Sequence, residues 1–158
     1  MDKVTVIART LFAYDNGTLR NKVSRGKAKS GAAVGTPDAY GYLVATVNGK
    51  THKVHRLIYA LFHDVIPDML DHINGNPADN RIENLRPANH KQNGCNSVRN
   101  HNNTTGVKGV SRLQNKWIAQ CQVEGKRHYL GIFKDLKVAE ARVIEFRTTH
   151  HKEFARNG

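Results

Sequence analysis

The sequence predicts an α+β fold that combines short antiparallel sheets with short helices. Two Asn-Gly pairs, Asn16-Gly17 and Asn48-Gly49, each separate stretches of strand-forming residues, which is a strong local signal for a β-hairpin. Apolar residues recur at helical spacing between residues 54 and 63. The end of the chain shows three strand patterns and then a helical one.

We expect the first hairpin at residues 11–14 and 18–23 and the second at residues 42–47 and 50–54. The segment between the hairpins is predicted to be a flexible basic loop, because its cations are interspersed with Gly, Ser and Ala. Its cationic residues are Arg20, Lys22, Arg25, Lys27 and Lys29. Such a loop is either simply solvated or in contact with phosphates.

A short packing helix is predicted from Val54 to about residue 63, and Pro67 excludes its continuation. His55 and Arg56 open this helix. They form either an ordinary polar first turn or a nucleic-acid contact, and we carry Arg56 forward as a candidate DNA-binding residue.

Residues 74–103 contain ten asparagines and little apolar content after Leu85, so we expect mostly loop there. Residues 100–105 have no apolar side chain and are predicted to be a linker. The expected domains are therefore residues 1–103 and 104–158.

The final segment predicts strands at residues 109–113, 117–123 and 127–133, and then a helix capped by Asp135. On that helix Leu136, Ala139, Val143 and Phe146 follow a 3-4-3 spacing. We therefore expect a three-stranded sheet backed by one helix.

Composition narrows the function. A chain of 158 residues excludes a large multi-domain enzyme, and its net charge of +12 indicates a polyanionic partner. Basic residues outnumber acidic ones by 8 to 3 in residues 1–52, 6 to 5 in 53–103 and 11 to 5 in 104–158. A near-neutral centre between basic flanks is expected where the centre needs carboxylates, for instance to bind a metal.

Neither a membrane-spanning segment nor a signal peptide is predicted, so we expect the cytoplasm of a bacterial or phage-infected cell and no membrane partner. Cys95 and Cys121 form no Cys-x-x-Cys pair, which favours free thiols and argues against a structural zinc site.

The centre also holds the candidate chemistry. Asp71-His72 places a hard anionic oxygen beside a group that titrates near neutrality, so one can hold a cation while the other activates water. Asn84 and Asn93 offer amide oxygens for a cation or for fixing an imidazole. Singly, an Asp-His pair beside Gly and Asn is more typical of a turn, so the inference depends on the ordered set.

The set Asp71-His72, Asn84 and Asn93 resembles the HNH nuclease motif as found in phage and intron-encoded homing endonucleases. The likeness extends from residue 54 to residue 93. It implies a β-hairpin and a helix around one divalent ion, with His72 as general base, Asn84 holding the His72 loop, and Asp71 and Asn93 as metal ligands. Asn93 stands where many of these enzymes have a histidine, which favours Mg²⁺, with Mn²⁺ as a substitute, over zinc.

The final segment resembles the ethylene-response-factor (Apetala-type) DNA-binding domain, through residues 106–110, 116–119, 129–133 and the helix that follows. In that family the sheet lies in the major groove. Strand alternation then puts Trp117, Ala119 and Cys121 against the helix and Ile118 on the opposite face. The DNA-binding candidates on that open face are Arg112, Gln120, Gln122, Arg127 and Tyr129. The alternative for this sheet is a packing module with a solvated face.

Together these observations predict a metal-dependent endonuclease of the HNH homing type. It would act as a monomer and nick double-stranded DNA with site preference, leaving 5′ phosphate and 3′ hydroxyl ends. One alternative is a non-catalytic DNA-binding regulator that uses the C-terminal sheet, and another is an RNA-binding protein, which fits the charge but not that sheet.

Overall fold

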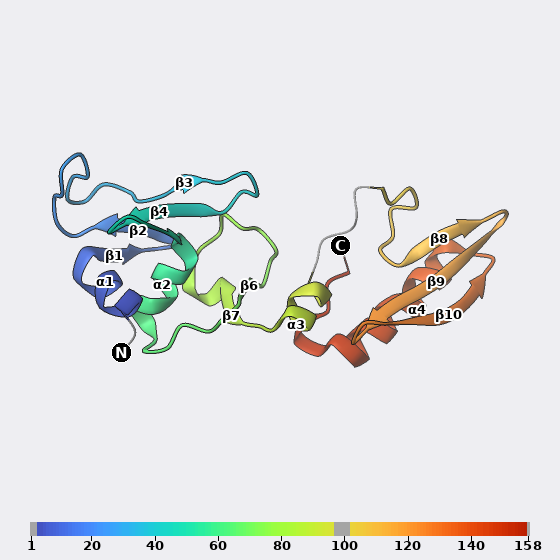
Figure 1. Ribbon diagram of the computed structural model, residues 1–158. Coiled ribbons are helices and arrows are strands. Elements are labelled where there is room, and N and C mark those ends of the chain that lie inside the picture. Colours follow the sequence, from blue (N-terminus) through green and yellow to red (C-terminus); the bar gives the residue numbers. More distant parts are fainter. Residues whose placement is uncertain (1–2, 97–101, 158) are drawn as a thin grey trace. The chain divides into compact units, whose positions relative to one another are not determined.

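The computed structural model describes residues 3–96 and 102–157. These residues form two compact units, Met1–Asn89 and His90–Gly158. The expected α+β class is confirmed, with short helices and small antiparallel sheets in each unit (Figure 1). The predicted boundary at residue 103 stays a prediction, and part of the predicted linker at 100–105 lies outside the described residues.

The first unit confirms both predicted hairpins. Strands β1 (Phe12–Asp15) and β2 (Thr18–Asn21) pair around Asn16-Gly17, and β4 (Leu43–Val47) and β5 (Lys50–Lys53) pair around Asn48-Gly49. All four turn residues have positive φ, which is the geometry that Asn-Gly hairpin turns require. The short strand β3 (Thr36–Pro37) adds to the edge of β4.

Two helices pack on each other in the first unit, and the first of them was not predicted. In helix α1 (Lys3–Leu11), the apolar residues Val4, Ile7, Ala8 and Leu11 recur at helical spacing. The start of this segment also alternates between polar and apolar residues, a pattern that fits a strand, and packing on α2 accompanies the helix. Helix α2 (Val54–Phe62) confirms the predicted packing helix, and Val54, Leu57 and Ile58 are fully buried.

The basic segment between the hairpins differs from the flexible loop that the sequence predicts. It folds back along β2, with backbone hydrogen bonds from Asn21 N to Ala32 O (3.0 Å) and in both directions between Arg25 and Ala28 (2.8 and 3.0 Å). Backbone pairing therefore gives this segment a defined course that its Gly, Ser and Ala content does not predict.

The region from residue 70 contains more structure than its asparagine content suggests. Strand β6 (Leu70–His72) pairs antiparallel with β7 (Leu85–Pro87), and the connection includes a 3₁₀ turn, η1 (Ile82–Asn84). Helix α3 (His90–Cys95) follows β7 in the chain and belongs to the second unit. This order of two strands and a helix is the one that the HNH resemblance implies.

The second unit confirms the predicted sheet and helix. Strands β8 (Val110–Leu113), β9 (Lys116–Val123) and β10 (Lys126–Phe133) form one antiparallel sheet in the order β10-β9-β8. Helix α4 (Leu136–His151) lies along one face of it (Figure 1), and the turn η2 (Lys152–Phe154) follows. The Asp135 side chain caps α4 by accepting hydrogen bonds from the backbone N–H groups of Lys137 and Val138.

Both cysteines are free thiols, as expected. Among the described residues, no helix is long and apolar enough to cross a membrane.

Candidate active site

His72 lies at the end of β6, in the interior of the first unit. Its side chain and that of Asp71 belong to residues that are each 4% exposed. The register of the hairpin pairs Asp71 with Arg86 and His72 with Leu85, so neighbouring positions on β6 present their side chains to opposite faces. The hairpin thus buries an acid and a base at adjacent positions.

Asn84 holds the loop that follows His72. Its Oδ1 accepts a hydrogen bond from Asn74 N (3.0 Å), and its Nδ2 donates to Asn74 Oδ1 (3.0 Å) and to Asp79 O (2.7 Å). The backbone of Asn84 also accepts from Ile73 N (2.9 Å). These bonds connect Asn84 to Ile73, Asn74 and Asp79 in the segment that follows His72.

Asn80 is a site residue that the sequence analysis did not single out. Its Oδ1 lies 3.0 Å from His72 Nε2, and Asn80 is only 2% exposed. Because an amide oxygen can only accept, this contact places the proton on Nε2 and leaves the lone pair on Nδ1. Asn80 lies in the segment that carries the HNH resemblance, but it was given no role there because it is one of many asparagines in a polar loop.

An ion pair joins the residues on either side of Asn80, Asp79 and Arg81. Arg81 donates to both carboxylate oxygens of Asp79 (2.9 and 2.7 Å), and Asn74 Nδ2 donates to Asp79 Oδ2 (2.7 Å). The hydrogen bond from Arg81 holds the pKa of Asp79 well below its usual value. Hydrogen bonds from Asn74 and from Arg81 to Asp79 therefore hold the loop that carries Asn80.

Asp71 is paired with Arg86. Arg86 Nε and Nη2 lie 2.9 and 2.7 Å from Asp71 Oδ2, and both side chains are largely buried. A cation held by Asp71 would therefore share this carboxylate with the Arg86 guanidinium.

Asn93 lies on α3, in the second unit, so its placement beside Asp71 stays a prediction. Among the described residues, no three His, Cys, Asp or Glu side chains form a group that could hold a metal.

Two aromatic side chains pack against the His72 ring, and a lysine packs against one of them. His55 from α2 meets it edge-on at 4.9 Å between centroids, and the Tyr42 ring lies 5.9 Å from His72 and 5.6 Å from His55. Lys53 Nζ lies 3.7 Å from the centre of the Tyr42 ring. The sequence analysis did not assign a role to Tyr42 or Lys53.

Burial keeps both imidazoles of this cluster neutral near pH 7. It lowers the pKa of His55 from 6.5 to about 3, with a smaller contribution from the neighbouring His72. It also lowers the pKa of His72, although the hydrogen bond to Asn80 opposes the change. A neutral His72 with its lone pair on Nδ1 can accept a proton from water.

Several basic side chains of the first unit that were predicted to contact DNA form hydrogen bonds or ion pairs within the protein. Arg20 pairs with Asp15 (2.7 Å), Lys22 Nζ donates to Arg9 O (2.7 Å), and Arg25 donates to Asn21 Oδ1 (3.0 Å). Arg56 Nη1 donates to Asp68 O (2.9 Å). Lys27 and Lys29 line a shallow recess between the loop and β4.

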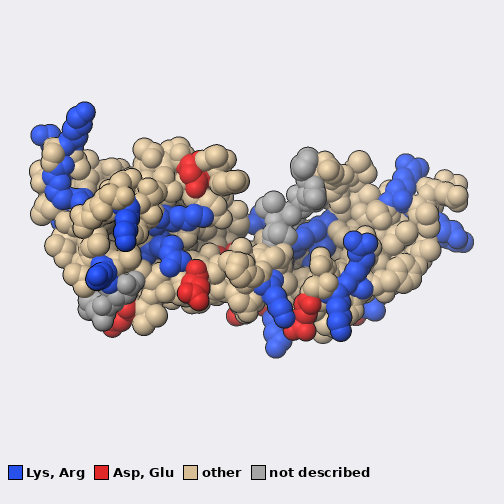
Figure 2. Space-filling view, viewed as in Figure 1, with Lys and Arg blue, Asp and Glu red and all other residues tan. Residues whose placement is uncertain are grey.

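Lys and Arg side chains are spread over the visible face of each unit (Figure 2).

The open face of the second-unit sheet carries four of the five predicted contacts. Gln122 pairs with Arg127 and Gln120 with Tyr129 across β9 and β10, while Ala119 and Cys121 are buried on the opposite face, toward α4. The placement of Arg112 on the open face is wrong. Arg112 pairs with Trp117, and its guanidinium lies 5.9 Å from the Trp117 ring, because alternation from buried Val110 puts it on the same face as Trp117.

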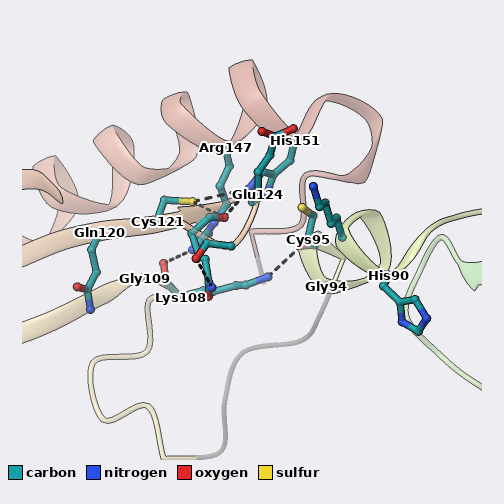
Figure 3. Close-up of a pocket in the computed structure, with 13 residues that line it drawn as sticks. His90, Gly94, Cys95, Lys108, Gly109, Gln120, Cys121, Glu124, Arg147 and His151 are labelled. Carbon is teal, nitrogen blue, oxygen red and sulfur yellow. Dashed lines mark hydrogen bonds between the residues drawn. The ribbon is translucent and has the colours of Figure 1, made fainter. Parts of the chain in front are cut away.

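A pocket of about 460 Å³ lies in the second unit (Figure 3). Its cations face backbone carbonyls: Lys108 Nζ donates to Cys95 O (3.3 Å), and Arg147 Nη2 donates to Lys108 O (2.7 Å). Burial lowers the pKa of Lys108 to about 8. These bonds link α3 to the segment before β8, and that segment to α4. We therefore assign Lys108 and Arg147 a structural role in the second unit.

Comparison with known proteins identifies the type of site. Residues 52–95 match the family model of the HNH endonucleases, from β5 through α3. The chain is also 36% identical over 111 residues to Protein 3.8 of Escherichia phage T7, a match that covers 68% of this chain and 91% of that protein. The chain belongs to the same family as Protein 3.8. No solved structure matches the chain.

This member of the Protein 3.8 family therefore carries an HNH endonuclease domain at residues 52–95, which indicates a nuclease that acts on DNA. The matched segment includes all four predicted site residues, Asp71, His72, Asn84 and Asn93, and also Lys53, His55 and Asn80. Tyr42 and the second-unit sheet lie outside the matched segment.

Proposed function

We propose that this protein is a divalent-metal-dependent HNH endonuclease of the homing type that nicks double-stranded DNA with site preference. The observation that carries the proposal is the buried His72 inside the HNH segment, with its Nε2 bonded to Asn80 Oδ1 at 3.0 Å. A histidine fixed in this way is suited to act as a base through Nδ1.

His72 would take the proton of the attacking water, and Asn80 and Asn84 would keep the imidazole and its loop in place. Asp71 and Asn93 would hold one Mg²⁺ or Mn²⁺, which when bound stabilises charge on the phosphate and on the departing 3′ oxygen. The products would carry 5′ phosphate and 3′ hydroxyl ends.

We assign sequence preference to the second unit. Its open sheet face presents Gln120, Gln122, Arg127 and Tyr129, and the segment 104–158 carries 11 basic and 5 acidic residues. Amides and a guanidinium can read base edges, whereas the remaining charge neutralises phosphates. The resemblance to Apetala-type domains supports this division of labour.

The test is nicking of supercoiled plasmid by purified protein, compared between wild type and His72→Ala. We expect Mg²⁺ or Mn²⁺ to support nicking, EDTA to stop it, and His72→Ala to lower the rate by about 10²- to 10⁴-fold while DNA binding persists. Asp71→Asn or Asn93→Ala should raise the Mg²⁺ concentration required. Equal cutting by wild type and His72→Ala, or full activity in EDTA, would refute the mechanism.

The second candidate function is a non-catalytic DNA-binding regulator, and the exposed sheet face is the observation that favours it. Tight, sequence-selective binding without any metal-dependent nicking would identify this function instead. Mapping of cleavage ends on a genomic DNA library would in turn test the homing type and the site preference.

A further inference from the structure

Lys53 is a cation that contacts one of the rings packed against the candidate base. It ends β5 and occupies the position that precedes α2, and its side chain makes no helix-capping bond. Among the described residues no carboxylate forms an ion pair with it, and the first turn of α2 has no acidic residue. A positive charge at a helix N-terminus opposes the helix dipole, so Lys53 stands where an anion would be favoured.

The Tyr42 ring connects Lys53 to the site. Lys53 Nζ lies 3.7 Å from the ring centre, and the same ring lies 5.9 Å from that of His72. Tyr42 is partly buried, and its backbone N–H donates to Asp38 Oδ1 (2.9 Å), which fixes the residue that carries the ring. The cation–π contact therefore holds the long, exposed Lys53 side chain against Tyr42, next to the rings of His55 and His72.

We propose that Lys53 is a catalytic residue that contacts a non-bridging oxygen of the phosphate attacked at His72, with the Tyr42 ring as its positioning group. This inference rests on the proposed function of His72. The attacked phosphate gains negative charge as water adds to it, and a cation already positioned at that charge stabilises the transition state more than the ground state. The cation–π contact places Lys53 against a ring that itself packs on His72.

The experiment measures single-turnover cleavage at saturating DNA for Lys53→Met and for Lys50→Met, an exposed lysine on the same strand. We expect Lys53→Met to lower the rate by about 10²-fold, as loss of one preorganised donor typically does, while Lys50→Met cuts at the wild-type rate. Lys53→Arg should recover part of the loss because it restores the charge.

Tyr42 supplies a matched pair of variants. Tyr42→Phe keeps the ring and should keep the rate, whereas Tyr42→Leu should lose rate, and Tyr42→Leu combined with Lys53→Met should be no slower than Lys53→Met alone. Thermal melting of each variant verifies that the first unit remains folded.

DNA binding in EDTA gives a readout that does not depend on cleavage. If Lys53 touches a phosphate, Lys53→Met should reduce the slope of log affinity against log salt by about 1. An unchanged cleavage rate for Lys53→Met, or a loss of affinity alone, would overturn the proposal while loss of cutting by His72→Ala still supports the nuclease. Equal cutting by wild type and His72→Ala would instead remove the proposed function and the role of Lys53 with it.

Discussion

At the scale of single residues, the hydrogen bond between Asn80 and His72 sets which imidazole nitrogen can act as a base. Asn80→Ala removes the acceptor for His72 Nε2–H, so the ring can rotate or change tautomer. We expect single-turnover cleavage to fall by about 10- to 100-fold with little change in DNA affinity. Asn76→Ala, at an exposed position of the same loop, is the control and should cut normally. A wild-type rate for Asn80→Ala would show that Asn80 does not orient His72.

His55 makes the stability of the first unit depend on pH. Its pKa is about 3 in the folded protein and near 6.5 when unfolded, so the unfolded chain binds a proton first as the pH falls. Its contribution to stability is fully present above pH 6.5 and is lost progressively toward pH 3, at about 1 kcal/mol per pH unit.

The measurement is urea unfolding at pH 7.5 and pH 5, comparing wild type with His55→Gln and with His63→Gln, an exposed histidine. We expect His55→Gln to flatten the loss of unfolding free energy on acidification and His63→Gln to leave it unchanged. The same slope in all three proteins would contradict a buried, neutral His55.

At the scale of elements, strand register decides which arginine of the C-terminal sheet faces outward. Arg127 pairs with Gln122 on the open face, whereas Arg112 pairs with Trp117 on the face toward α4. We therefore expect Arg127→Ala to weaken DNA binding more than Arg112→Ala does. If Arg127 contacts guanine, the preference at one base position should also relax by about 1 to 3 kcal/mol.

Cleavage-site profiling and affinity measurement at matched salt test this difference. Thermal unfolding of Arg112→Leu and Arg127→Leu shows whether either substitution weakens binding by destabilising the sheet and not by removing a DNA contact. A larger effect at Arg112 would mean that the open face of this sheet is not the DNA-binding surface.

At the scale of the whole molecule, the segment 104–158 carries much of the positive charge, whereas the four predicted site residues precede it in the chain. Deletion of residues 104–158 removes 11 basic and 5 acidic residues, a net charge of +6, and leaves Asp71, His72, Asn84 and Asn93 in the chain. We expect weaker DNA binding, a flatter dependence of log affinity on log salt, and residual cutting with blurred site preference at high enzyme concentration. Cleavage profiling of the full chain beside the truncation tests this, and identical profiles with equal affinity would assign DNA binding elsewhere.

Local chemistry made much of this fold predictable. The two Asn-Gly turns, the helical spacing from Val54 and the Asp135 cap each depend on residues close in the sequence, and each element forms where expected. Helix α1 was missed because residues 3–11 fit both periods, and its packing on α2 resolves the ambiguity.

The sequence by itself determined the two Asn-Gly hairpins, the C-terminal sheet, helices α2 and α4 and the ordered set Asp71-His72, Asn84 and Asn93, because turns, periodicity and motif spacing are local properties of the chain. Tertiary structure alone decided that Asn80 hydrogen-bonds the His72 ring and that Tyr42 and His55 pack against it. It also decided that Lys53 packs on Tyr42 and that Arg112 shares a face with Trp117. These contacts join strands and helices that are distant in the chain, and side-chain packing and strand register set them.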